Sequence, residues 1–317
     1  MKIIFLFLCF LICFSKLIDQ VRKDVVRKAL LNLPKRESLD ILKMCLKMSS
    51  FKSTYSLNDA ESAYLAYKWI EQNIEYDKND EEQGNSSTAI ATVYKTGKGG
   101  ATGITGLFKT MCDRLKIKSD TILGLTKTSS GTIKMKIITK EYSWNYILIN
   151  NKYYLIDVVK SIGFEKSKKR ESDFYFGMDP ETSIRLHFPN DNKWQFLPKN
   201  ITKNKFKSMA YLDEGFYSLG LKTISPDIQS LGDNKRITIK LTSDKSFDEI
   251  FDQLEFVEVV SSLDKDYSPE IDTFDIYKIS NGEYTFNFAL YSGLFSSLSA
   301  KNKKTGEIFY LMCFDSI

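Results

Sequence analysis

The amino-acid sequence predicts an α+β fold, with helices packed on an antiparallel sheet, followed by a β-sandwich-like C-terminal module. Three observations support this prediction. Apolar residues recur at helical spacing up to Leu115, strand and hairpin signals follow from Ile117 to Val159, and short alternating runs separated by turn residues lie beyond Phe216. Helices gathered on one side of an antiparallel sheet are the layer arrangement of α+β proteins.

Composition is that of a globular protein. The 317 residues are 43% hydrophobic and 27% charged, which suits one large domain or two ordinary ones. The net charge of +5 is modest, and the dense basic run Lys166–Arg170 is short. This run favours a solvated loop over a phosphate-binding patch, and no nucleic-acid partner is expected.

The N-terminus carries a targeting signature. Met1-Lys2 precedes an apolar run from Ile3 to Phe14, which is too short to span a bilayer but fits a secretory signal. We expect a signal peptide over residues 1–17, cleavage after Ser15 or a few residues later, and secretion. An uncleaved membrane anchor and an apolar first helix stay open. No later run is long enough to cross a membrane, so no stable span is expected in the mature chain.

The N-terminal part reads as helical. The spacing of apolar residues predicts helices over Asp19–Leu31, Leu39–Met48 with Ser38 as cap, a longer segment from Asn58 or Asp59 to about Tyr76, and Thr88–Lys95. Pro34 breaks the first of these helices.

A glycine-dense turn runs into the next helix. Thr96–Cys112 contains Gly97, Gly99, Gly100 and Gly103, after which apolar residues continue at helical spacing. A helix start of this kind presents unpaired N–H groups and a positive dipole end, so a nucleophile placed there is easily activated. Here the first residue after the turn is Ala101, which has no reactive group.

Strand signals follow this helix. They cover Ile117–Leu125, Ile133–Ile138, Tyr142–Ile149 and Tyr153–Val159, and Asn150-Asn151 predicts a hairpin between the last two.

Several of these motifs carry a family resemblance. A glycine turn opens a helix with Leu107-Phe108-Lys109 and Cys112, Trp144-Asn145 lies in a strand, and Leu155-Ile156-Asp157 ends a hairpin. In this order they resemble the transglutaminase-like superfamily, whose fold is shared with papain-like cysteine peptidases. The segment Asp173–Leu197, with its His187-Phe188-Pro189, is similar to the kyphoscoliosis-type branch. The resemblance covers about Leu57–Pro226.

The resemblance implies a catalytic triad that this chain does not keep. Active members place a Cys nucleophile at the helix start, a His base two residues before Trp-Asn, and an Asp at the end of the next strand. These positions fall on Ala101, Tyr142 and Asp157, and only Asp157 has the family's residue type. Without a nucleophile and a base that work as a unit, the family mechanism is lost.

Other chemistry finds little support. His187 is the chain's only histidine, and the resemblance implies that its motif is structural or peripheral to the triad. Cys112 is expected to be a buried small hydrophobe, and the three cysteines Cys45, Cys112 and Cys313 predict no disulfide framework. One histidine and three scattered cysteines cannot supply a structural zinc site, and no metal or cofactor is expected.

The sequence therefore predicts two modules after the signal: a transglutaminase-like domain with a helical lead-in over residues 18–218, and a β-rich domain over residues 219–317. The predicted function is a secreted pseudoenzyme that binds or scaffolds a protein or peptide partner. Trp144, Asn145 and Thr102 are the candidate cleft residues. The alternative is an active transglutaminase-like, peptidase-like or other hydrolase with a non-standard mechanism. The oligomeric state is not specified.

Overall fold

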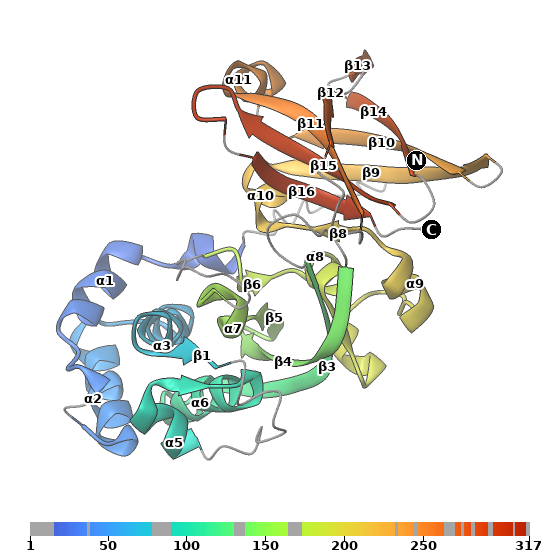
Figure 1. Ribbon diagram of the computed structural model, residues 1–317. Helices are drawn as coiled ribbons and strands as arrows, with labels where there is room; N and C mark the ends of the chain where they lie inside the picture. Colours follow the sequence, from blue (N-terminus) through green and yellow to red (C-terminus); the bar gives the residue numbers. More distant parts are fainter. Residues whose placement is uncertain are drawn as a thin grey trace, which may run out of the picture.

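The structure is a computed structural model of the chain, and Figure 1 shows the order of its elements. It describes residues 16–36, 39–77, 90–129, 137–163, 173–231, 234–243, 246–262, 270–273, 276–279, 283–290, 294–306 and 308–314. Residues 1–15 of the predicted signal segment and the polar stretch before Ile90 lie outside these residues, whereas Lys16 and Leu17 are described and Leu17 is buried.

Helices form the first part of the chain. They are η1 (Leu17–Gln20), α1 (Lys23–Leu31), α2 (Ile41–Thr54), α3 (Asp59–Asn73), α5 (Ile90–Thr96) and α6 (Ala101–Arg114), with the short strands β1 (Glu75–Tyr76) and β2 (Lys98–Gly99) pairing in parallel. Local sequence explains the starts of these helices. Asn58 and Glu61 form a reciprocal capping box at α3, and the Asp40 side chain accepts a hydrogen bond from Lys43 N at α2.

A five-stranded antiparallel sheet follows the helices. Its strand order is β6-β5-β4-β3-β7, built from β3 (Lys118–Ser129), β4 (Ile137–Ile149), β5 (Lys152–Ile156), β6 (Phe176–Met178) and β7 (His187–Pro189). Helix α6 lies against β3 and β4 and buries its apolar face there. One large core joins α1, α2, α3, α5 and α6 to this sheet, which confirms the α+β prediction.

Some boundaries differ from the sequence prediction. The prediction of two separate strands, at Ile133–Ile138 and Tyr142–Ile149, was wrong in part, because β4 runs unbroken from Ile137 to Ile149 along β3. Residues 130–136 lie outside the described residues. The strand expected to reach Val159 ends at Ile156, because Asp157 caps the short helix α7 (Val158–Ser161). Ser38, expected to cap the second helix, is also outside the described residues, and Asp40 caps it.

A connecting region leads to the C-terminal part. It contains α8 (Pro180–Leu186), η3 (Asn192–Gln195), α9 (Lys203–Ser208), β8 (Tyr211–Leu212) and α10 (Glu214–Ser218). Strand β8 pairs with the last strand of the chain, and Leu212 and Phe216 belong to a second hydrophobic core. The predicted division between residues 218 and 219 stays a prediction.

The C-terminal part is β-rich. One sheet has the order β13-β14-β10-β9 and the other has the order β12-β11-β15-β16-β8. Their strands are β9 (Leu221–Leu231), β10 (Asn234–Ser243), β11 (Leu254–Ser262), β12 (Glu270–Thr273), β13 (Ile276–Ile279), β14 (Glu283–Leu290), β15 (Leu294–Asn302) and β16 (Ile308–Phe314), and the helix α11 (Phe247–Gln253) precedes β11. Packing of the two sheets as a sandwich stays a prediction.

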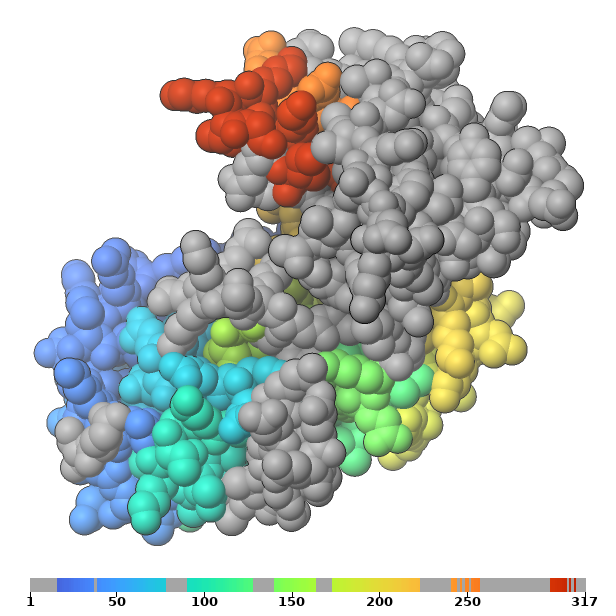
Figure 2. All heavy atoms as spheres, viewed as in Figure 1, coloured from blue at the N-terminus to red at the C-terminus, as the bar shows by residue number. Residues whose placement is uncertain are grey.

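The outer layer of the first part is helical. Figure 2 shows the atoms of α1 and α2 along one margin of the molecule, on the side of the sheet opposite α9. None of the helices in the described part of the chain has the length and apolar character that a membrane crossing needs.

Candidate functional site

The start of α6 carries Ala101, the residue on which the resemblance places the family's nucleophile position. Gly97 takes a left-handed conformation with φ of 74°, and a Cβ at Gly99 would lie 2.7 Å from a methyl carbon of Val93. Glycine is therefore required at both positions of the turn. Gly100 is the N-cap and supplies no capping side chain, and Ala101 is the first helical residue, with none of its surface exposed. The turn is built as expected, but it presents a buried methyl group.

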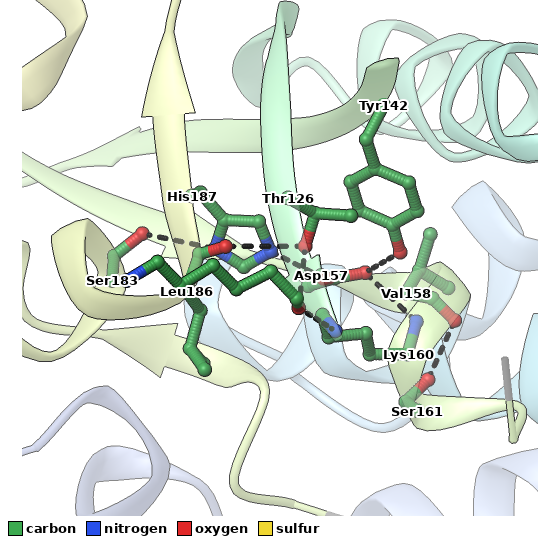
Figure 3. Close-up of polar contacts among 10 residues, drawn as sticks. Thr126, Tyr142, Asp157, Val158, Lys160, Ser161, Ser183, Leu186 and His187 are labelled. Carbon is green, nitrogen blue, oxygen red and sulfur yellow. Dashed lines mark hydrogen bonds and ion pairs between the residues drawn. The ribbon is translucent and has the colours of Figure 1, made fainter. Parts of the chain in front are cut away.

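Asp157 is the centre of a buried polar cluster, shown in Figure 3. Its Oδ1 accepts hydrogen bonds from the Tyr142 hydroxyl and from the backbone N–H of Lys160, each at 2.8 Å. Its Oδ2 lies 2.7 Å from Nε2 of His187. Asp157, Tyr142 and His187 are all buried. Tyr142 and Asp157, on which the resemblance places the base and Asp positions, thus contact one another.

His187 reaches this cluster through the pairing of β7 with β3. In this register Thr126 faces His187 and Gly124 faces Pro189. A Cβ at Gly124 would lie 2.2 Å from the Phe188 carbonyl oxygen, so only glycine allows β7 to approach β3 this closely. The resemblance implied that the His187 motif is structural or peripheral to the triad, and the structure places its ring in contact with the Asp157 carboxylate, thirty residues earlier in the chain. The glycine inside the strand was the sequence signal for this close approach.

Aromatic rings enclose the His187 imidazole. It stacks on Trp144 with ring centroids 4.8 Å apart and on Tyr142 at 5.9 Å. Burial is the main cause that lowers the pKa of His187 below its ordinary value of 6.5, although contact with Asp157 acts in the opposite direction. We assign a neutral ring whose Nε2–H donates to Asp157. Its Nδ1 then accepts from the hydroxyl of Ser183, 3.4 Å away on α8.

A second polar contact ties α6 to β4. The hydroxyls of Thr105 and Ser143 lie 3.1 Å apart, and the Asn145 amide donates to the Thr105 carbonyl oxygen at 3.1 Å. These groups hold the start of α6 against the strand that carries Tyr142 and Trp144. The arrangement fixes positions within the core, since Thr105, Ser143 and Asn145 are all buried.

The candidate cleft residues differ in accessibility. Trp144 and Asn145 are buried, whereas Thr102 is partly exposed. A peptide could contact Trp144 or Asn145 only after a conformational change, so peptide binding at this position stays a prediction. A surface hollow of about 390 Å³ lies elsewhere, at Leu33, Trp69 and Asn73.

The described cysteines supply no replacement nucleophile. Cys112 is fully buried, as expected, and burial raises its pKa. Cys45 is also a buried free thiol, and burial raises its pKa to about 11. Both groups stay protonated at neutral pH, and only the thiolate is nucleophilic. The side chain of Cys313 lies outside the described part. Among the described residues no group of three or more His, Cys, Asp or Glu side chains could hold a metal ion.

Comparisons with known proteins identify the family that this part of the chain is similar to. A family model described as the transglutaminase-like superfamily matches residues 51–158. The chain is 24% identical over 193 residues to kyphoscoliosis peptidase of Mus musculus, covering 58% of this chain and 29% of that protein. It is 23% identical over 205 residues to cytokinesis protein 3 of Schizosaccharomyces pombe, covering 63% of this chain and 22% of that protein. The chain thus matches less than a third of the length of these curated relatives.

A solved structure titled as a transglutaminase (TGase) is 12% identical. The match covers 45% of this chain and 36% of the chain in that structure, with a TM-score of 0.31.

Proposed function

Because this chain carries a domain of the transglutaminase-like superfamily and is of the kyphoscoliosis-type branch, we propose that it is a catalytically inactive member that acts by binding a protein or peptide partner. The observation that carries the proposal is Ala101. It is the first residue of α6, it is buried, and it has no atom that could attack an acyl group.

The contacts of Asp157 support the same conclusion. In a working triad the carboxylate orients a base that faces a nucleophile. Here Asp157 accepts from Tyr142, from the Lys160 backbone and from His187. The other nitrogen of His187 faces the Ser183 hydroxyl at 3.4 Å, but Ser183, His187 and Asp157 are all buried, so an acyl substrate has no access to this serine as the structure stands. The Asp157 carboxylate therefore has the contacts of a structural group, and each of these side chains is buried.

The test is an assay of the purified full chain for amine incorporation and for peptide hydrolysis. We expect no turnover above buffer, and the same null result for Asp157→Asn. Turnover in the unmodified protein that is lost in Asp157→Asn would refute inactivity. Binding is tested separately, by isolating a stable complex from extracts and reconstituting it with the purified partner.

Restoring the lost groups tests whether the frame of the site remains. Ala101→Cys with Tyr142→His returns the family's residue types to both positions. Thr102→Cys with Tyr142→His is the matched control, because it adds the same thiol one residue further along α6. Activity in the first variant alone would indicate that only the chemistry was lost. Inactivity in both would indicate that the site has also been remodelled.

A second candidate function is an active enzyme with a different mechanism. The close contact between His187 and Asp157 favours it, because a histidine paired with a carboxylate is the usual general base of acyl transfer. This candidate predicts turnover in the unmodified protein and its loss in His187→Gln. It requires access to a nitrogen of a ring that is buried as the structure stands.

We also propose that the chain enters the secretory route, on the strength of the apolar run Ile3–Phe14. Expression in a eukaryotic cell followed by N-terminal sequencing of the protein in the medium tests this. We expect a chain beginning at Lys16 or a few residues later. A cell-retained chain that begins at Met1 would contradict cleavage.

A further inference from the structure

Three leucine side chains are exposed on the outer helical layer. Leu31 at the end of α1 is 77% exposed, and Leu42 and Leu46 on α2 are 53% and 69% exposed. Leucine is usually buried, and several exposed leucines on one layer are a stronger signal than a single one. This layer forms the outer margin of the molecule in Figure 2.

The outward face of α2 alternates leucine with lysine. Leu42 and Leu46 are one turn apart, and Lys43 and Lys47 lie beside them, so all four occupy one side of the helix. The opposite side is buried in the core through Met44, Cys45, Met48 and Phe51. The Lys43 ammonium pairs with the exposed Asp40 carboxylate at 3.3 Å, and the Lys47 ammonium lies 4.9 Å from the centroid of the Phe51 ring. Both lysines are exposed, so their charges stay at the surface. The exposed leucines are therefore not part of the side of the helix that packs into the core.

The surrounding surface is basic. From Asp24 to Thr54, the exposed charged side chains among the described residues comprise five cations and two anions: Arg27, Lys28, Lys35, Lys43 and Lys47 against Asp24 and Asp40. This excess is local, because the whole chain of 317 residues has a net charge of only +5.

We propose that the outward face of α2, with the basic surface of α1, binds the anionic surface of a phospholipid bilayer. Leu42 and Leu46 enter the interface between headgroups and acyl chains, while Lys43 and Lys47 attract anionic headgroups. The outward side of a helix is convex, which suits insertion into a soft interface. An acidic protein partner would need a groove of matching shape.

A chain that keeps the apolar run Ile3–Phe14 has a second element for the same task, whereas cleavage on the secretory route proposed above removes it. The apolar run Ile3–Phe14 precedes this layer directly along the chain. Stable attachment to a bilayer generally needs two signals, such as one apolar insertion and one polybasic patch. The outward face of α2 provides the patch, whether or not the apolar run is retained.

Vesicle co-sedimentation of the full chain tests the proposal. The vesicles are phosphatidylcholine alone, or phosphatidylcholine mixed with phosphatidylserine. The measured quantity is the partition coefficient for the phosphatidylserine-containing vesicles divided by that for phosphatidylcholine alone. A contribution of residues 3–14 that does not depend on lipid charge cancels in this ratio. We expect the ratio to be well above one at low salt and to fall as salt screens the charges.

Charge reversal locates the binding surface. The double variant Lys43→Glu with Lys47→Glu should lower the ratio by about 30-fold or more. Each lysine near an anionic surface contributes about 1 kcal/mol of attraction, and about 1.4 kcal/mol corresponds to a tenfold change in binding. Lys203→Glu with Lys207→Glu on α9 is the matched control, because these two exposed lysines have the same spacing on another helix. The control pair should change the ratio by a few-fold at most.

Leucine removal tests the apolar contribution. Leu42→Ser with Leu46→Ser should weaken binding to the phosphatidylserine vesicles about tenfold, whereas Leu123→Ser, at an exposed leucine of β3, should not. Circular dichroism melting confirms that each variant is folded. A ratio near one for the unmodified chain, or equal losses from the α2 and α9 lysine pairs, would overturn the proposal.

Discussion

Acidification should destabilise the first part of the chain through a single histidine. His187 is the chain's only histidine, it is buried, and burial lowers its pKa below 6.5. In the unfolded chain this imidazole takes up a proton near pH 6.5, whereas in the folded chain it stays neutral to lower pH. The stability that depends on the neutral ring is therefore fully present above pH 6.5 and is lost as the pH falls below that value.

The size of the effect has an upper limit set by linkage. One proton taken up on unfolding changes the free energy of unfolding by about 1.4 kcal/mol per pH unit. Between pH 7.5 and pH 5.5, a ring that stays neutral when folded would therefore cost at most about 1.4 kcal/mol of stability. The loss becomes smaller as the contact between Nε2 and Asp157 favours the charged ring.

Denaturant unfolding followed by tryptophan fluorescence measures this loss. All three tryptophans of the chain, Trp69, Trp144 and Trp194, lie before the C-terminal sheets, so the signal reports on the first part alone. His187→Gln is the control, because its side chain does not titrate. We expect the unmodified protein to lose stability between pH 7.5 and pH 5.5 and the variant to lose much less. Equal losses, or a protein that becomes more stable on acidification, would refute the reasoning.

Three further predictions concern the same cluster. Gly124→Ala should cost about 1–3 kcal/mol in urea unfolding, since the new methyl group collides with the Phe188 carbonyl oxygen; an unchanged midpoint would contradict the close approach. Tyr142→Phe should cost about 1.5–3 kcal/mol by removing a donor to the Asp157 carboxylate, and a smaller cost would show that the hydroxyl is dispensable. Ala101→Cys should react slowly with iodoacetamide in the folded protein and quickly in urea, and fast labelling of the folded protein would show that the helix start is open.

Local signals predicted the elements that depend on neighbouring residues. Asn58 caps α3 as expected, and Asn150-Asn151 joins β4 to β5 with both residues in left-handed conformations, at φ of 50° and 60°. The turn into α6 also followed from its glycines. Each of these features is decided within a few residues, so one sequence is sufficient to predict it.

Predicting the site requires knowledge of contacts between segments that are far apart in the sequence. His187 meets Asp157 because β7 pairs with β3, and this register joins segments about sixty residues apart. Propensity and periodicity do not specify such a pairing. Burial of Trp144 and Asn145 is likewise set by the packing of whole elements, so their accessibility could not be predicted from the motif that contains them.

The position of Asp157 bears on how activity is inferred from single residues in enzyme families. The same carboxylate caps α7, holds the hydroxyl of Tyr142 and holds the ring of His187. Leaving a buried donor without its partner typically costs about 1–3 kcal/mol, so selection for folding alone would retain this aspartate whether or not the protein turns over a substrate. An acidic residue at the third triad position is therefore a poor marker of activity, and screens of genomes for working enzymes of this fold should weigh the residues at the helix start and the base position.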